Sequence, residues 1–364
     1  MTFRHATTAL LIAGAAALIA MPAGADMLSE LVAGAKKESS LRVTLHPTIA
    51  PDTAKKVAAA FNKAYGLSID VKPDLTGRYS GKAAKGAIEY KTGGKPSYDV
   101  MVLNESAFMT LAAADALVRI EGWRDMLPEG TNPAKASPGP IAGIGFKCCD
   151  LYWGFSYNPG KFDSARLPLA MKDLGGAGKA AITLFASNIT AAILKYDAAT
   201  LVGYAKAWGA AKVKRLHPTA MAQRVALGEF ALGGFQSTEQ FLDATQKGAK
   251  LSIAMFKDFV PHGVLLHAVR KGAESPNAAK LFVMWTTGRD AIGAMSEGNN
   301  LGNADYGGNE AIEIARRESE KVGVVPASFF DSAENYGKLQ WLATKAGKKF
   351  TGQIVRGIKG TKKK

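Results

Sequence analysis

Polar side chains with binding chemistry follow three apolar segments in the first half of this 364-residue chain. Segments 41–45, 67–71 and 98–103 predict strands, and each is followed by a short polar loop. The loop residues that we expect to contact a ligand are His46, Thr48, Thr76, Gly77, Arg78, Tyr79, Ser80, Asn104 and Glu105. A guanidinium such as that of Arg78 can bind a carboxylate or phosphate through two hydrogen bonds, and a helix N-terminus beside it can share the charge. These loops predict a site for a polar or anionic group, with a solvated surface turn as the alternative.

A similar set of polar residues occurs in the second half of the chain. Ser187, Asn188 and Thr190 follow an apolar segment at 180–185 and precede a helical one, and Gln223 lies at the start of the next helix. They predict a second wall of the same site. The sequence contains no Ser-His-Asp pattern, no paired carboxylates and no His-x-x-x-His spacing that would single out a catalytic or metal site. We therefore predict no catalytic residue, no metal ligand and no cofactor.

The elements that must position these loops alternate between strands and helices. Strand 41–45 precedes a helix beginning at Pro51, strand 67–71 precedes a helix reaching Ile88, and strand 98–103 precedes a helix capped by Asn104. Such alternation predicts an α/β fold with a mainly parallel sheet flanked by helices. In that fold ligands bind beyond the carboxyl ends of the strands, where all of these loops lie. Further strands are expected at 152–157, 180–185, 251–256 and 263–269.

The N-terminus has the three parts of a secretory signal peptide. Arg4 supplies the basic region, residues 9–21 are apolar, and Ala23-Gly24-Ala25 fits a cleavage signal. The apolar run is short for a membrane span, which leaves an uncleaved anchor as the weaker alternative. We expect cleavage near Ala25 and export to the periplasm, where nucleic acid is not an expected partner.

Two further features are the adjacent cysteines and the excess of positive charge. Cys148 and Cys149 are compatible with a vicinal disulfide, with two thiols or with pairing between chains. The formal net charge is +15, but eight basic residues and no acidic one lie between Lys345 and Lys364. We expect residues 351–364 to form a basic C-terminal tail that is solvated or weakly touches an anionic membrane surface.

Several separate stretches resemble the solute-binding proteins of ABC importers. They span most of the chain and include residues 31–38 (LVAGAKKE), 157–161 (YNPGK), 167–182, 227–230 (LGEF) and 271–282 (KGAESPNAAKLF). The resemblance is to extracellular solute-binding family 1, in particular the subgroup that contains ferric-ion, phosphonate and sugar-phosphate binders. At position 171 a methionine replaces the aromatic residue of that pattern.

The resemblance implies a type II periplasmic-binding fold, in which two α/β lobes are joined by two crossing strands. Lobe one would comprise residues 26–150 and 265–300, and lobe two residues 151–264 and 301–350, after a signal peptide at 1–25. Asp258 and His262 precede the second crossing strand, where members of the family often contact solute. Closure around a solute, followed by docking on a membrane permease, is the implied mechanism.

The resemblance leaves the solute open. A small polar or anionic organic compound is the leading expectation, with a monomeric receptor that has no enzymatic activity. Ferric iron is the alternative, but the adjacent tyrosine pair of the family's iron binders is absent from the sequence. Two other hypotheses remain. The chain could be an exported enzyme on the same fold, or a receptor that presents its solute to a membrane sensor. Tyr152, Trp153 and Phe155 fit either stacking on a solute or packing within the crossing strand.

Overall fold

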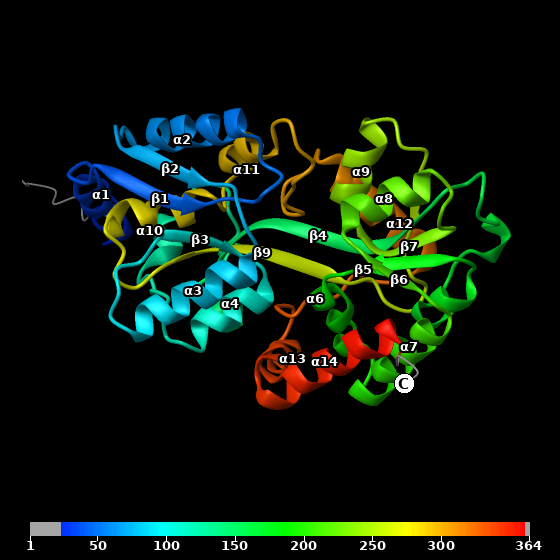
Figure 1. Cartoon of the computed structure of the whole chain (residues 1–364). Helices are drawn as coiled ribbons and strands as arrows, with labels where there is room; N and C mark the ends of the chain where they lie inside the picture. The colour runs from blue at the N-terminus through cyan, green and yellow to red at the C-terminus, as the bar shows by residue number, and fades with distance from the viewer. Residues whose placement is uncertain (1–22, 361–364) are drawn as a thin grey trace, which may run out of the picture.

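The computed structural model describes residues 23–360, and its nine strands form one continuous mixed sheet (Figure 1). The strand order is β2-β1-β3-β9-β4-β7-β5-β6, with β8 paired to β4. The strands are β1 (Ser40–Thr44), β2 (Asp70–Asp74), β3 (Val100–Leu103), β4 (Phe146–Tyr157), β5 (Ala180–Thr183), β6 (Lys214–Leu216), β7 (Leu232–Ser237), β8 (Ser252–Ala254) and β9 (His262–Val269). Residues 1–22 of the predicted signal peptide lie outside the described part of the chain.

Each half of the sheet is mainly parallel. Strands β2, β1 and β3 pair in parallel in lobe one, and β7, β5 and β6 do so in lobe two. One antiparallel strand borders each set, β9 against β3 and β4 against β7. The predicted two-lobe α/β fold is therefore confirmed.

Helices cover both faces of the two half-sheets (Figure 1). The α-helices are α1 (Ala23–Ala35), α2 (Pro51–Tyr65), α3 (Tyr79–Lys91), α4 (Glu105–Ala112), α5 (Pro133–Ala136), α6 (Ala186–Thr190), α7 (Ala198–Ala210), α8 (Pro218–Ala226), α9 (Thr238–Gln246), α10 (Pro276–Trp285), α11 (Arg289–Ser296), α12 (Glu310–Val322), α13 (Ala333–Ala343) and α14 (Lys345–Lys359). Short 3₁₀ turns occur at η1 (Trp123–Met126), η2 (Gly139–Ile141), η3 (Ser164–Arg166), η4 (Met171–Gly176) and η5 (Ala191–Leu194). Within residues 23–360, no helix is both long enough and apolar enough to cross a membrane.

Two antiparallel strands carry the chain between the lobes. Residues Phe146–Tyr152 of β4 pair with β9, and Trp153–Tyr157 pair with β7. Strand β4 therefore begins in lobe one and ends in lobe two. The sequence predicted only its second half, because Lys147 and Asp150 interrupt the apolar pattern that marks a buried strand.

The C-terminal helices depart from the predicted domain boundaries. Helix α13 packs against α4 of lobe one, and just before it Phe330 makes an edge contact with Phe108, with ring centroids 6.5 Å apart. The segment assigned to lobe two at 301–350 therefore contacts both lobes. Figure 1 shows α13 and α14 side by side at the lower edge of the molecule.

The predicted tail at 351–364 is wrong for residues 351–359, which form the second half of α14. Phe350, Ile354 and Ile358 recur every four residues and are buried on one face of this helix. That face packs on α7. The backbone of Gly357 lies so close to α7 that a Cβ added at Gly357 would lie 3.0 Å from the Cβ of Ala205. The basic residues between these positions suggested a solvated tail, although the apolar spacing is that of an amphipathic helix. Residues 361–364 lie outside the described part of the chain.

The two cysteines are free thiols buried in the core of lobe one. The Cys148 thiol lies 3.5 Å from the carbonyl oxygen of Leu265 on β9. Of the three states left open by the sequence, the structure has the two separate thiols. Their burial leaves no surface for pairing between chains.

We predict that Phe350→Ala destabilises the protein by about 3–5 kcal/mol, the usual cost of emptying a buried aromatic site. Lys349→Ala is the matched control, because Lys349 is exposed on the same helix and its loss should change stability by less than about 0.5 kcal/mol. Urea unfolding of both variants measures the difference. Equal effects would mean that α14 does not contribute to the folded core.

Candidate ligand-binding cleft

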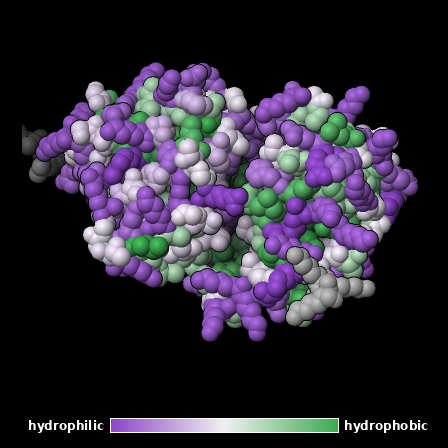
Figure 2. Space-filling model, in the orientation of Figure 1, coloured by the Kyte–Doolittle hydropathy of each residue, from purple (hydrophilic) through white to green (hydrophobic). Residues whose placement is uncertain are grey.

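A cleft of about 1660 Å³ lies between the two lobes and receives side chains from both. Figure 2 shows the molecule hollowed between its two halves. The cleft is lined by thirteen of the fifteen predicted site residues: His46, Thr48, Gly77, Arg78, Tyr79, Ser80, Asn104, Glu105, Ser187, Asn188, Thr190, Gln223 and His262. Whether each contacts a solute stays a prediction.

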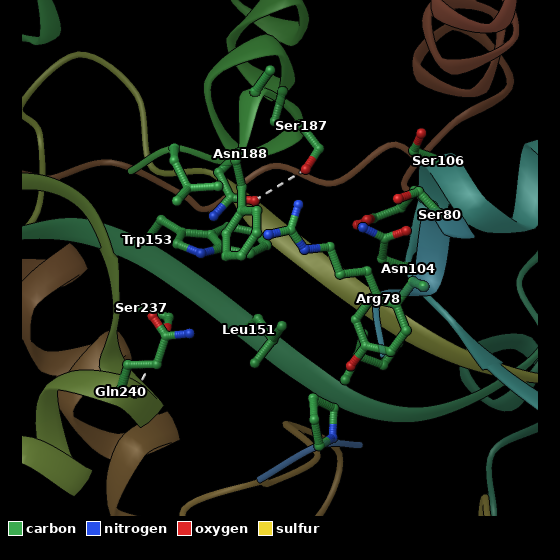
Figure 3. A pocket seen from close by; sticks show the side chains of 18 of the residues that line it. Arg78, Ser80, Asn104, Ser106, Leu151, Trp153, Ser187, Asn188, Ser237 and Gln240 are labelled. Atoms are coloured by element: carbon green, nitrogen blue, oxygen red, sulfur yellow. Dashed lines mark hydrogen bonds between the residues drawn. The ribbon is translucent and has the colours of Figure 1, made fainter. Parts of the chain in front are cut away.

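The wall from lobe one is built by loops at the carboxyl ends of β1, β2 and β3. The Asn104 side chain accepts a hydrogen bond from the Ala107 amide at 3.0 Å, which starts α4 at the edge of the cleft. Arg78 is the residue before α3, and its exposed side chain forms no ion pair with any residue of the 23–360 range. In Figure 3 it extends into the cleft toward Asn188 of the opposite lobe. A free guanidinium therefore faces a polar wall.

Two buried polar groups lie beside Arg78. His46 Nδ1 is 2.6 Å from the Thr48 hydroxyl, and burial lowers the pKa of His46 to about 4. His46 is therefore neutral near pH 7. The Tyr79 ring packs against it at 6.1 Å, and the buried Tyr79 hydroxyl has no hydrogen-bond partner among the described residues. Such a hydroxyl can donate to a bound group.

The wall from lobe two combines hydroxyls, an amide and an aromatic ring. Ser187 and Asn188 come from α6, and the Ser187 hydroxyl lies 3.3 Å from Asn188 Oδ1 (Figure 3). Trp153 of β4 lines the cleft, although only 8% of its surface is exposed. Its six-membered ring lies against Gly263 of β9, where a Cβ would collide with it. Trp153 therefore serves both packing and the cleft, the two roles left open by the sequence.

Two predicted residues lie outside the cleft lining. Thr76 is held by Asp74, whose Oδ1 accepts from the Thr76 amide at 2.7 Å and from its hydroxyl at 2.6 Å. Asp258 accepts from the Met171 amide at 3.0 Å and from the Tyr196 hydroxyl. These hydrogen bonds direct both side chains into structural contacts, and their contact with a solute stays a prediction.

Sequence reasoning missed a polar group at the junction of β7 and α9. Ser237 ends β7 and caps α9 by accepting from the Gln240 amide at 3.3 Å, and Glu239 lies in the first turn of the helix. All three side chains line the cleft, and Figure 3 shows Ser237 and Gln240 on its wall. Two glycines in β7 obscured the strand, but the Ser-x-x-Gln spacing before an apolar helix face is a usable N-cap signal.

Carboxyl groups face the cleft from each lobe, with Glu105 partly buried and Glu239 buried. Glu105 of α4 accepts a hydrogen bond from the Val264 amide at 2.7 Å, and burial raises the pKa of Glu105. Glu239 of α9 is 5% exposed, and its Oε2 accepts from the Ser237 hydroxyl at 3.1 Å. Burial raises the pKa of Glu239 to about 7, against the hydroxyls of Ser237 and Thr48. Near neutral pH, Glu239 therefore exists in both protonation states.

The base of the cleft is fixed by a buried charge network on the crossing strands. His262 Nε2 lies 2.7 Å from Asp150 Oδ1, and its ring stacks on Tyr152 at 4.5 Å. Lys147 Nζ lies 3.1 Å from Asp150 and 2.7 Å from Asp305. Burial alone would raise the pKa of Asp150, but His262 and Lys147 hold it well below its usual range. His262 is thus oriented by the hinge itself, and Tyr152 lies outside the cleft lining.

The cleft is more basic than acidic at its rim. Its lining contains five Lys and Arg side chains and three Asp and Glu side chains: Arg78, Lys91, Lys247, Lys250 and Lys348 against Glu105, Glu239 and Asp243. Lys247 is neutralised by Asp243 at 2.8 Å, which leaves four cations outside ion pairs within the described chain. The field over the opening therefore favours anions.

Solved structures with this architecture are periplasmic binding proteins. The periplasmic binding protein P5PA has a TM-score of 0.64 at 17% identity, over 88% of this chain and 100% of that one. AfuA from Actinobacillus pleuropneumoniae, with fructose-6-phosphate bound, has a TM-score of 0.63 at 14% identity, over 88% and 99%. Iron-bound HitA from Pseudomonas aeruginosa has a TM-score of 0.59 at 17% identity, over 79% and 100%.

No protein-family model matches the sequence, and no curated protein does so either. The structural likeness nevertheless extends over almost the whole described chain. The chain therefore has the type II periplasmic-binding fold, as the sequence resemblance predicted.

The acidic and histidine side chains that line the cleft are not grouped as metal ligands. Within residues 23–360, no group of three or more His, Cys, Asp and Glu residues is arranged to hold a metal ion. Cleft residues Glu105, Glu239 and His262 belong to different elements and have protein partners of their own.

We predict that Glu239→Gln removes a pH-dependent loss of stability. Between about pH 4.5 and 7 the folded chain keeps a proton on Glu239 that the unfolded chain has released, so stability falls as pH rises through this window. The full effect above pH 7 is about 3 kcal/mol. The variant should therefore be more stable than wild type at pH 8 and similar to it near pH 4.5.

Urea unfolding of both proteins between pH 5 and 8 measures this difference. His46 titrates in the opposite sense and is common to both, so it cancels. Asp52→Asn is the control, because Asp52 is exposed, pairs with Lys55 on α2 and lies outside the cleft lining, so its loss should leave the slope unchanged. An unaltered slope in Glu239→Gln would contradict the assignment.

Proposed function

We propose that this chain is an exported receptor that closes its two lobes around a small polar or anionic organic solute and delivers it to the permease of an ABC importer. The observation that carries the proposal is the cleft between the lobes, where the unpaired guanidinium of Arg78 faces the hydroxyl and amide groups of Ser187 and Asn188. Export to the periplasm, cleavage near Ala25 and a monomeric state belong to this proposal.

Binding begins with the field of the cleft rim and ends in direct contacts. The unpaired cations at the opening attract an anionic solute, and Arg78 then forms two hydrogen bonds with its carboxylate or phosphate. The first amides of α3, beside Arg78, add donors for the same group. Ser80 and Asn104 complete the polar contacts from lobe one.

Closure brings the second wall onto the solute. The crossing strands β4 and β9 are the path between the lobes, so bending them changes the width of the cleft. Ser187, Asn188 and Gln223 then contact the face of the solute opposite Arg78. The closed receptor presents a surface spanning both lobes, which a permease can distinguish from the open one. No chemical change of the solute is part of this proposal.

Related folds support the breadth of solutes that such a cleft accepts. Neighbours with this fold include structures with glucopine and with fructose-6-phosphate, and a spermidine/putrescine binding protein. The fold alone therefore does not select the solute. The selection in this chain belongs to the side chains that line its own cleft.

The test is to identify the solute that co-purifies with the full chain by mass spectrometry and to titrate it calorimetrically. We predict that Arg78→Ala weakens its binding at least tenfold, about 1.4 kcal/mol. Arg78→Lys should recover part of the affinity, because lysine keeps the charge without the bidentate geometry. Arg316→Ala on α12 is the control, since Arg316 pairs only with Glu313 and Glu320. Unchanged affinity in Arg78→Ala would remove this residue from the site.

A further inference from the structure

An acidic corner of the cleft is left unexplained by a purely anionic solute. Glu105 enters it from lobe one and Glu239 from lobe two. Neither carboxyl group forms an ion pair with any residue between 23 and 360. The remaining acidic side chain of the lining, Asp243, is already paired with Lys247. The corner therefore holds two carboxyl groups whose charge the protein does not balance.

The protein contacts of these carboxyl groups satisfy only part of their bonding capacity. Glu105 accepts from the Val264 amide at 2.7 Å, and Glu239 accepts from the Ser237 hydroxyl at 3.1 Å and from the Thr48 hydroxyl. An ionised carboxylate can accept about four. A buried carboxylate without a counter-charge is strongly unfavourable, so such groups are usually paired. Here the missing partner has space, because both groups border the cleft.

Two aromatic residues complete the same corner. A Cβ on Gly263 would collide with the Trp153 ring and lie 3.2 Å from Glu105 Oε1. The ring and the carboxylate therefore both pack against the backbone of Gly263. The Tyr79 hydroxyl is buried without a partner in the described chain. Burial raises the pKa of Tyr79, and the nearby charges of Glu239 and Glu105 are among the groups that raise it further. Glu105 therefore lies beside the Trp153 ring, and the Tyr79 hydroxyl is within reach of the charges of both carboxyl groups.

We infer that this corner receives an ammonium group, so that the solute carries a cation at one end and a carboxylate or phosphate at the other. The inference rests on the proposed receptor function and names its solute class as amphoteric. Glu239 and Glu105 balance the ammonium charge, Trp153 offers it an aromatic face, and Arg78 binds the anionic end. Because the two carboxylates belong to different lobes, an ammonium group bound by both would hold the lobes closed around the solute.

Other occupants fit the corner less well. A sugar hydroxyl donates one hydrogen bond and leaves both carboxylates without a counter-charge. A divalent or trivalent metal ion would need a set of ligands that no group of residues in the 23–360 range forms. An ammonium group donates three hydrogen bonds in a tetrahedral arrangement and brings the charge that the corner lacks.

The test uses matched probe pairs that differ by one amine. The pairs are phosphoethanolamine and ethyl phosphate, 4-aminobutanoate and butanoate, and glucosamine 6-phosphate and glucose 6-phosphate. Thermal shift of the purified full chain selects the binders, and calorimetry measures their affinities. We expect the amine-bearing member of the best-binding pair to bind at least tenfold more tightly than its partner.

Variants separate the charge of the corner from its shape. Glu239→Gln should reduce the amine preference to less than threefold, whereas Glu239→Asp should retain part of it. Tyr79→Phe, which removes one hydroxyl, should weaken the amine-bearing probe alone. Asp52→Asn, an exposed carboxylate outside the cleft lining, is the matched control and should retain the full preference.

Two results would overturn the inference without touching the proposed function. One is a tightest probe without an amine whose binding still depends on Arg78. The other is an undiminished amine preference in Glu239→Gln. Failure of every probe and of the co-purified fraction to bind the wild-type chain would instead overturn the receptor function itself.

Discussion

The pairing of β4 with β9 is the interaction on which the rest of the structure depends. It joins two half-sheets into one, because β9 also pairs with β3 and β4 also pairs with β7. The charge network of Asp150 strengthens the joint, since it binds His262 of β9, Lys147 of its own strand and the Ala304 amide at 2.7 Å. Three separate segments of the chain are thereby held at one residue. The cleft exists because the loops of both half-sheets open toward this joint.

The free-energy cost of burying the Asp150 carboxylate is offset by its contacts with Lys147, His262 and the Ala304 amide. An unpaired carboxylate in such a place would be among the costliest groups in the protein. The same reasoning distinguishes Asp150 from Glu239, which is nearly as buried but lacks a cation. One carboxylate is saturated by the fold and serves the hinge. The other is left incomplete at the cleft, where a solute can complete it.

Much of this architecture follows from sequence patterns, because parallel strands bring their carboxyl ends to one edge. Loops after the predicted strands therefore met in the cleft, although the strand near 67–71 begins three residues later, at Asp70. Thr76 and Asp258 lie outside the cleft lining for different reasons. Thr76 bonds to Asp74, two residues before it, whereas Asp258 bonds to Met171 and Tyr196, tertiary partners that local patterns do not encode. Glu239 was missed for a different reason. The strand before it, β7, contains two adjacent glycines, so neither strand propensity nor alternation predicted that strand or the start of the helix after it.

The fold shows where part of the positive charge of the chain lies on the molecule. Lys345, Lys348, Lys349, Arg356 and Lys359 are exposed around an amphipathic helix whose apolar face is buried on α7. These five basic residues are thus carried by a helix that packs on α7, and one of them, Lys348, reaches the cleft lining. A single helix therefore contributes to stability through its apolar face and to the potential at the opening through its basic face. Neighbours of this fold share only 13–17% identity with the chain, so their likeness establishes the fold and not the arrangement of charge around this cleft.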